Sequence, residues 1–229
     1  MFHPEGPTFA ELMRQALAST ERGYDLLAPK FDRTPFRTPD AVITEMIAAI
    51  GEAGAALDVC CGTGAVMQQL RAVCSERVVG VDFSQGMLDE ARRRLEGAPG
   101  EARIELVRGD ALELPFLEEM DVVTSAGAFG HVLVEDEDRF IAGIARTLKP
   151  GGRFVFPTTR APRMTDGWFW MAHGFNAVMR VRNALRRPPF IMYYLTFLWP
   201  EVRAKLERNG FSVRAAEHDR FVIVTATKR

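Results

Sequence analysis

The feature that most constrains the fold is the stretch at residues 56–65, Ala-Leu-Asp-Val-Cys-Cys-Gly-Thr-Gly-Ala. Leu57 and Val59 favour a buried strand. Gly62 and Gly64 allow a sharp turn in which the backbone can lie close to a ligand. The residues that follow repeat apolar side chains at helical spacing. A strand, a glycine loop and a helix in this order predict a ligand cradle at the carboxyl edge of a parallel sheet.

The composition of this loop narrows the choice of ligand. A phosphate-binding loop would carry Gly-Lys-Ser/Thr, and a dinucleotide fingerprint would carry a third glycine where Met67 stands. Asp58 immediately precedes the loop, where it would repel a pyrophosphate but suit an ammonium group. Asp82 ends the next predicted strand. Its separation from Gly64 along the sequence is about that at which an acidic residue reaches a ribose diol. The two carboxylates predict a ligand that combines a nucleoside with an amino-acid-like cation. S-adenosylmethionine (SAM) fits that description.

Five segments of the chain resemble motifs of the class I SAM-dependent methyltransferases and occur in that family's order. They are residues 57–64, 79–88, 108–116, 121–125 and 148–156. The resemblance implies SAM as the cofactor and methyl transfer as the activity. The chain departs from the commonest form of the family's first motif at Cys61, the position at which we expect the family to have, frequently, a third glycine.

The resemblance also implies contacts to the cofactor. Asp82 would hold the ribose, and Asp110 would face the adenine amino group, although a carboxylate there could merely cap a turn. The cysteines of the loop are expected to shape the backbone, and no metal-ligand spacing is present, so no metal is expected. The expected cofactor-binding residues are Asp58, Cys60, Gly62, Gly64, Asp82, Phe83, Met87, Asp110, Ala111, Leu112 and Ser125.

Strand and helix patterns alternate through the middle of the chain, which is typical of a parallel sheet. We expect strands at 56–60, 78–82, 104–108, 121–125 and 152–157, and helices near 64–73, 85–96 and 136–147. Two later strands, 211–217 and 221–226, are separated by too few residues for a crossover and so predict an antiparallel hairpin. The expected fold is α/β, a Rossmann-like seven-stranded doubly wound sheet with an antiparallel last strand and a helical cap insertion.

The 229 residues suit a single domain, residues 1–229, with a helical lead at 1–50 and a cap insertion at 160–199. The insertion contains all three tryptophans, and six arginines against one acidic residue, Asp166. Such an insertion could be a packed lid with its arginines in solvent. We expect instead that it lines an acceptor pocket, because its aromatic residues exceed what a small lid requires. The candidate acceptor-binding residues are Trp168, Trp170, His173 and Tyr193.

The charge of the insertion leaves two possibilities for the partner. Arginines that face inward would select an acidic acceptor. Arginines that face outward could bring the protein to an anionic membrane surface to collect a lipid-like acceptor. We therefore expect a small-molecule or lipid-like acceptor, apolar, aromatic or acidic, and a weak membrane contact as an option.

His131 follows the fourth predicted strand, in a loop that faces the ligand in a sheet of this kind. An imidazole there could act as a general base or orient the acceptor, and it could equally be a residue that only packs. His131 is thus the one candidate catalytic residue.

Composition excludes several other classes. The formal net charge is −1, and no Asn/Asp-Pro-Pro-Tyr motif is present, so no nucleic-acid partner is expected. The first residues lack a basic start followed by an apolar run, and only three cysteines occur, so we expect a cytoplasmic protein. Two alternatives to methyl transfer remain: other SAM chemistry or non-catalytic SAM binding, and a nicotinamide-dependent oxidoreductase, which the absent third glycine disfavours.

Overall fold

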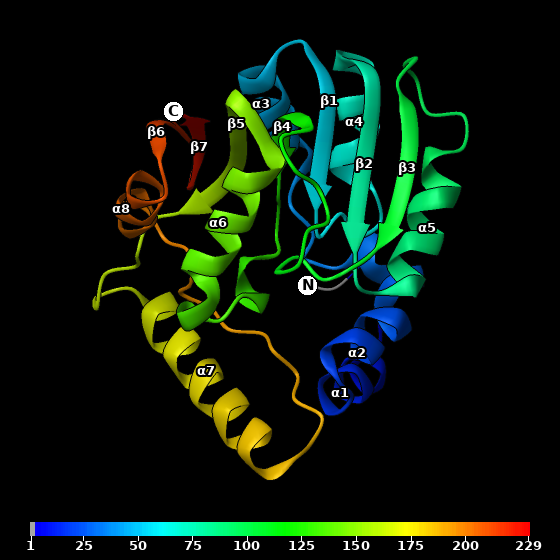
Figure 1. Cartoon of the computed structure of the whole chain (residues 1–229). Helices are drawn as coiled ribbons and strands as arrows, with labels where there is room; N and C mark the ends of the chain where they lie inside the picture. The colour runs from blue at the N-terminus through cyan, green and yellow to red at the C-terminus, as the bar shows by residue number, and fades with distance from the viewer. Residues whose placement is uncertain (1–2) are drawn as a thin grey trace.

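The computed structural model describes residues 3–229 and has a seven-stranded sheet at its centre, in the order β3-β2-β1-β4-β5-β7-β6 (Figure 1). Strands β1 to β5 pair in parallel, whereas β7 is antiparallel to both β5 and β6. The expected α/β sheet with its antiparallel last strand is therefore confirmed. The strands are β1 (Ala53–Val59), β2 (Cys74–Asp82), β3 (Arg103–Arg108), β4 (Met120–Thr124), β5 (Leu148–Thr159), β6 (Phe211–His218) and β7 (Phe221–Lys228).

Helices cover both faces of the sheet, because its central strands are apolar on both sides. One face, which includes Val78 and Val122, packs against α3 (Asp40–Ile50), α4 (Ala65–Val73) and α5 (Gln85–Leu95). The other face, which includes Val79 and Val123, packs against α6 (Glu137–Thr147) and α8 (Glu201–Arg208). The carboxyl ends of β1, β2 and β4 thus meet at one rigid edge between two helical layers (Figure 1).

The N-terminal lead is helical and reaches this edge; its residues 1–2 lie outside the described part of the chain. It forms α1 (Phe9–Leu17), α2 (Thr20–Leu27) and a 3-10 turn (Ala28–Arg33). The Thr8 hydroxyl and the Glu11 carboxylate form a capping box that begins α1. Asp25 of α2 accepts hydrogen bonds from the Ser84 hydroxyl (2.7 Å) and the Gly86 amide (3.0 Å), which fixes α2 against the start of α5.

The cap insertion consists of one long helix, α7 (Gly167–Leu185), and an extended connector that leads to α8. Figure 1 shows α7 across the carboxyl edge of the sheet from α1 and α2, with the connector running between them. The Arg182 guanidinium closes this arrangement by donating to the carbonyls of Ala16 (3.0 Å) and Ala18 (2.6 Å).

No helix within residues 3–229 is long and apolar enough to cross a lipid bilayer.

Candidate cofactor and acceptor site

The loop between β1 and α4 turns through three residues with left-handed backbone. They are Cys60 (φ 58°), Gly62 (φ 52°) and Gly64 (φ 79°). A side chain at Gly64 would also press on Leu95, whose Cδ1 would lie 3.2 Å from an added Cβ. Cys60 therefore occupies the third loop position whose backbone conformation favours glycine. The expectation that placed it at Cys61 was wrong by one residue, because backbone conformation is invisible in the spacing.

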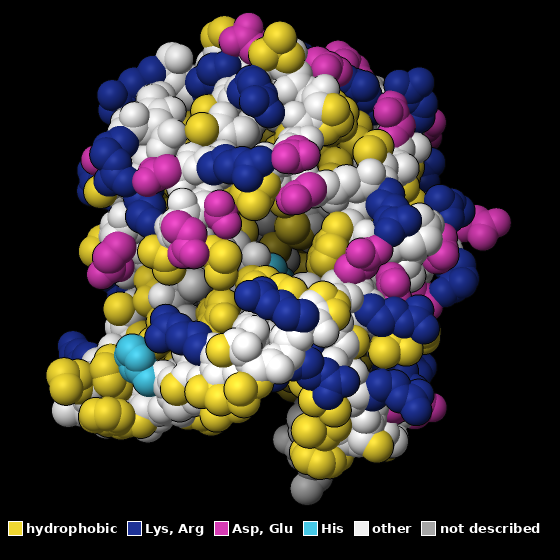
Figure 2. Space-filling view, turned by 60° about the horizontal axis from the view of Figure 1, so that its bottom comes forward, with side chains coloured by type: hydrophobic (Ala, Val, Ile, Leu, Met, Phe, Trp, Pro, Cys, Tyr) yellow, Lys and Arg dark blue, Asp and Glu magenta, His cyan; other side chains and the backbone are white. Residues whose placement is uncertain are grey.

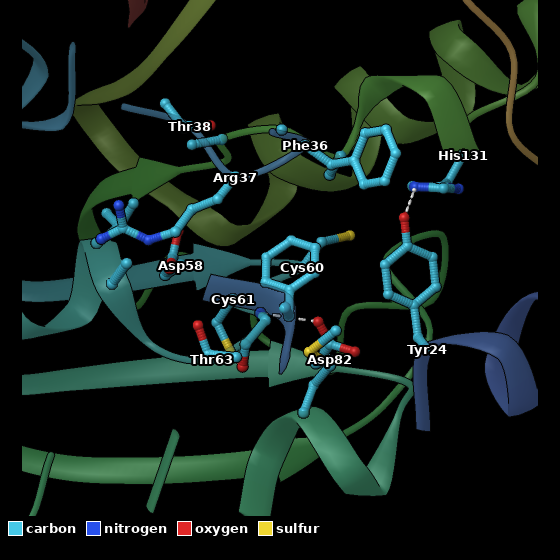
Figure 3. A pocket seen from close by; sticks show the side chains of 18 of the residues that line it. Tyr24, Phe36, Arg37, Thr38, Asp58, Cys60, Cys61, Thr63, Asp82 and His131 are labelled. Atoms are coloured by element: carbon cyan, nitrogen blue, oxygen red, sulfur yellow. Dashed lines mark hydrogen bonds between the residues drawn. The ribbon is translucent and has the colours of Figure 1, made fainter. Parts of the chain in front are cut away.

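Asp82 ends β2 and organises this loop (Figure 3). Its Oδ2 accepts from the Gly62 amide (2.9 Å) and its Oδ1 from the Ser84 amide (2.9 Å). The side chain is buried, and this burial raises its pKa to about 6. A carboxylate offers about four lone-pair sites, so each oxygen retains one for a ligand hydroxyl.

Asp58 is the second buried carboxylate of the pocket. The register of the sheet pairs it with Thr124 of β4, whose hydroxyl donates to Asp58 Oδ1 (2.8 Å). Burial raises its pKa to about 7, and the nearby charge of Asp82 adds to the effect. Two buried carboxylates that share one wall favour a ligand that carries a positive charge and hydroxyl groups.

A deep pocket of about 90 Å³ lies against these two carboxylates. Cys60, Gly62, Phe83 and Met87, four of the expected cofactor residues, line it together with Asp58 and Asp82. Gly64 lies at the start of α4, just behind the loop. Ser125 is fully buried at the end of β4, and its hydroxyl has no hydrogen-bond partner within the described chain.

The loop after β3 does not line the deep pocket. Asp110 is exposed, and its Oδ1 accepts from the Leu112 amide (2.9 Å), which is the turn-capping role that the sequence left open. Ala111 and Leu112 pack against the core below the α6 face of the sheet. None of these three residues lines the deep pocket, so their role toward adenine stays a prediction.

The structure brings a Tyr24–His131 pair to the pocket, of which sequence reasoning named only the histidine. The Tyr24 hydroxyl lies 2.7 Å from His131 Nε2, and His131 Nδ1 lies 2.5 Å from the Ile191 carbonyl (Figure 3). A carbonyl only accepts, so Nδ1 carries the proton and Nε2 accepts from Tyr24. Burial lowers the pKa of His131 and raises the pKa of Tyr24, which keeps both groups neutral at pH 7.

Other residues of the N-terminal segment also close the pocket, and sequence reasoning did not place them there. Phe31, Phe36, Arg37 and Thr38 line it together with the glycine loop. Asp32 fixes this segment to the loop by accepting from the Thr63 hydroxyl (2.7 Å). The sequence assigns these residues only to the helical lead at 1–50.

A second, outer pocket of about 730 Å³ adjoins the deep one. The two pockets share wall residues, among them Tyr24, Phe36 and His131. Trp168 and Tyr193, two of the expected acceptor residues, line the outer pocket. Trp170 and His173 do not line either pocket; both are exposed on α7.

SAM fits the deep pocket by several independent features of the structure. Asp82 retains free lone pairs and Asp58 supplies a second carboxylate in the pocket wall, whereas the buried Ser125 does not line the pocket. A Cβ added at Gly62 would meet no atom within 4 Å, so the loop borders open space. In the described part of the chain, no three His, Cys, Asp or Glu side chains are grouped to hold a metal ion.

The sheet order, the glycine loop and the two carboxylates define the fold of a class I methyltransferase. Residues 56–152 match the methyltransferase domain family. Over these residues the chain is similar to the class I SAM-dependent methyltransferases, a family whose cofactor is SAM.

Among known proteins, the chain is similar to demethylmenaquinone methyltransferases. It is 39% identical over 112 residues to the one from Lactobacillus johnsonii, which covers 47% of this chain and 44% of that protein. It is 37% identical over 124 residues to the one from Bacillus licheniformis, with coverages of 53% and 51%. The chain thus spans about half the length of these relatives.

Solved structures share the fold over a larger part of the chain. An O-methyltransferase family protein from Burkholderia thailandensis gives a TM-score of 0.69 at 16% identity, covering 96% of this chain and 67% of that one. The magnesium protoporphyrin IX methyltransferase from Synechocystis, solved with bound S-adenosylhomocysteine (SAH), gives 0.58 at 19% identity, with coverages of 83% and 81%.

Proposed function

We propose that the protein transfers a methyl group from SAM in the deep pocket to a flat, apolar acceptor in the outer pocket. The observation that carries this proposal is the wall that the two pockets share, at Tyr24, Phe36 and His131. A methyl donor and its acceptor must meet in line at close range, which adjoining pockets allow. The similarity to demethylmenaquinone methyltransferases supports an acceptor of this kind.

The lining of the outer pocket favours an aromatic acceptor over an acidic one. Trp168, Tyr193 and Tyr194 line it. Two of its three arginines are already paired with carboxylates: Arg37 pairs with Asp32 (3.4 Å) and Asp40 (2.5 Å), and Arg160 pairs with Glu217. Arg220 lies over the ring of Phe221. A guanidinium that is already neutralised gives little additional attraction to an anionic acceptor.

In this proposal the chain positions the reactants, excludes water from them and accepts a proton. SAM, when bound, supplies a methyl group that its sulfonium already activates. Asp82 would accept hydrogen bonds from the ribose hydroxyls, and Asp58 would hold the cationic end of the cofactor. The pocket walls hold the acceptor and exclude water from the reacting groups.

The Tyr24–His131 pair can remove the hydroxyl proton of a phenol-like acceptor. The acceptor's proton passes to the Tyr24 oxygen while the Tyr24 proton passes to His131 Nε2. The acceptor then attacks as an anion, and the imidazolium holds the released proton, so charge is balanced. The neutral histidine that burial enforces is the state that this step requires.

The proposal is tested with a panel of acceptors and SAM, with SAH as the measured product. Reduced quinones, phenols, aliphatic amines and small carboxylic acids represent the possible classes. We expect SAH to accumulate only with the flat apolar members, in equimolar amount with the methylated product. Preference for amines or acids would contradict the acceptor class, and SAH release without any methylated product would contradict the transfer itself.

A further inference from the structure

The cap helix α7 has two apolar faces, although a helix of this kind needs only one to pack. Its inner face buries Ala172, Asn176 and Met179 against the rest of the protein. Its outer face points to solvent, and Leu185 on it is 84% exposed. We call the exposed residues on this face, which recur at helical spacing, the α7 stripe: Trp170, Val178, Val181 and Leu185.

Helix α1 carries a second exposed apolar stripe next to the first. Phe9, Met13 and Leu17 follow one another at intervals of four residues and therefore share one face. The bonds from Arg182 of α7 to the turn after α1 hold the two helices at the same end of the molecule. Figure 2, which brings this end forward, shows hydrophobic side chains along its lower border and a hollow above them. Exposed apolar side chains in continuous stripes mark an interaction surface.

Positive charge surrounds both stripes and is not neutralised by the protein. Arg14, Arg180, Arg186 and Arg187 are exposed, and within residues 3–229 none of them forms an ion pair. The carboxylates at this end are engaged elsewhere: Glu11 with Lys30 (2.7 Å), Glu5 with Arg33 (3.1 Å) and Asp166 with the Arg163 amide (2.8 Å).

We infer that the α7 and α1 stripes dock the protein on an anionic lipid surface. An apolar helix face that includes tryptophan and is flanked by arginines is the pattern of a helix lying in the membrane interface. Arginines next to that face are attracted to anionic headgroups. A second copy of the chain fits this surface less well, because a two-fold contact through α7 would bring like-charged arginines together.

The position of the stripes gives the docking a consequence for the acceptor. Trp168 lies in the first turn of α7, and Tyr193 and Tyr194 lie in the connector after it. Elements of the docking end therefore also form a wall of the outer pocket. A docked protein therefore holds this wall beside the lipid, where an apolar acceptor would reside. This consequence rests on the proposed function, whereas the docking itself rests only on the exposed stripes and their charge.

Vesicle co-sedimentation of the full chain tests the docking. We expect binding to vesicles of phosphatidylcholine and phosphatidylglycerol to exceed binding to pure phosphatidylcholine at least about tenfold, and to weaken with salt. The double substitution Val178→Asp and Leu185→Asp should reduce this binding about tenfold or more. Leu117→Asp is the matched control, since Leu117 is 67% exposed in the loop before β4; it should bind as the unaltered protein does.

Thermal unfolding and SAH affinity of the same preparations show whether the variants stay folded. Both should match the unaltered protein, since the two substituted residues are exposed. Equal binding to the two vesicle types, or no binding to either, would overturn the inference. Light scattering that shows a dimer, lost in the double variant, would assign this face to a second copy instead. Because vesicle binding is measured without methyl transfer, failure of the docking and failure of the proposed function are read separately.

Discussion

His131 and Tyr24 are separated by 107 residues in the chain and meet only because α2 is held against the start of α5. The pair carries two protons, one on the imidazole and one on the phenol, and the hydrogen-bond partners determine where each lies. The Ile191 carbonyl keeps Nδ1 protonated, and Tyr24 donates to Nε2. A buried neutral imidazole that accepts from a phenol is a base that needs no ionised neighbour.

Replacing Tyr24 by Phe should lower kcat about a hundredfold and change SAH affinity little, because a positioned proton acceptor contributes on this scale. His131→Ala should produce a similar loss, and the double variant should lose little more, because both residues act in one relay. Rates with the most active acceptor of the panel provide the measurement.

The pH profile adds a control for the same pair. Burial lowers the pKa of His131, so kcat at saturating SAM should stay level as pH falls from 8 to about 6.5 and decline only below that. Additive losses in kcat, or a loss confined to SAH affinity, would show instead that Tyr24 and His131 act separately or only contact the cofactor.

At the scale of elements, the cap helix explains why the expected acceptor residues divide into two groups. The inward positions of α7 are Ala172, Asn176 and Met179, at intervals of four and three residues. Trp168 lies one turn before the first of these and reaches the outer pocket. Trp170 and His173 fall on other faces of the helix, so aromatic enrichment alone could not separate them from Trp168.

This division predicts different effects for two tryptophans in the same helix. Trp168→Ala combined with Tyr193→Ala should raise the KM for the acceptor about tenfold or more, since both remove apolar contact area from the outer pocket. SAH affinity should stay within a few-fold, because neither residue lines the deep pocket. Trp170→Ala serves as the control and should leave the KM for a water-soluble acceptor unchanged. Equal losses of SAH affinity and acceptor turnover would make the cap a structural lid.

The strands themselves could be predicted well from the sequence, because buried apolar runs are bounded by glycine and acidic residues. Their starts could not. β2 begins at Cys74 and β5 at Leu148, four residues before the predicted positions. Cys74 and Arg77 extend β2 because they pair with Ala53 and Ala55 of β1, and Leu148 extends β5 because it pairs with Met120. Such extensions depend on a neighbouring strand and leave no local pattern.

For the whole molecule, the pocket wall that the glycine loop and Asp82 form comes from one local unit, so this juxtaposition could be predicted. The glycine loop and Asp82 belong to neighbouring strands, so their spacing in the chain already places them together. The remaining walls come from the N-terminal segment, where Phe36 and Arg37 are brought to the pocket by tertiary contacts such as Asp32 with Thr63. No periodicity connects these residues to the glycine loop.

The central claim is that the deep pocket binds SAM through Asp82, separately from the acceptor. Two charge-assisted hydrogen bonds to ribose hydroxyls should contribute enough that Asp82→Ala weakens binding at least about tenfold. Asp82→Asn, which can still accept from a backbone amide, controls for disturbance of the loop. The pKa of Asp82 is about 6, so its carboxylate is mostly protonated at pH 5 and ionised at pH 8, and affinity should rise with pH.

Calorimetric titration of SAH into the unaltered protein and these two variants, at pH 5 and pH 8, measures this directly. The prediction is one site per chain, binding about tenfold weaker at pH 5 than at pH 8 in the unaltered protein, and a smaller pH dependence in Asp82→Asn. Folded Asp82→Ala protein that binds SAH as tightly as the unaltered protein at pH 8 would contradict the account.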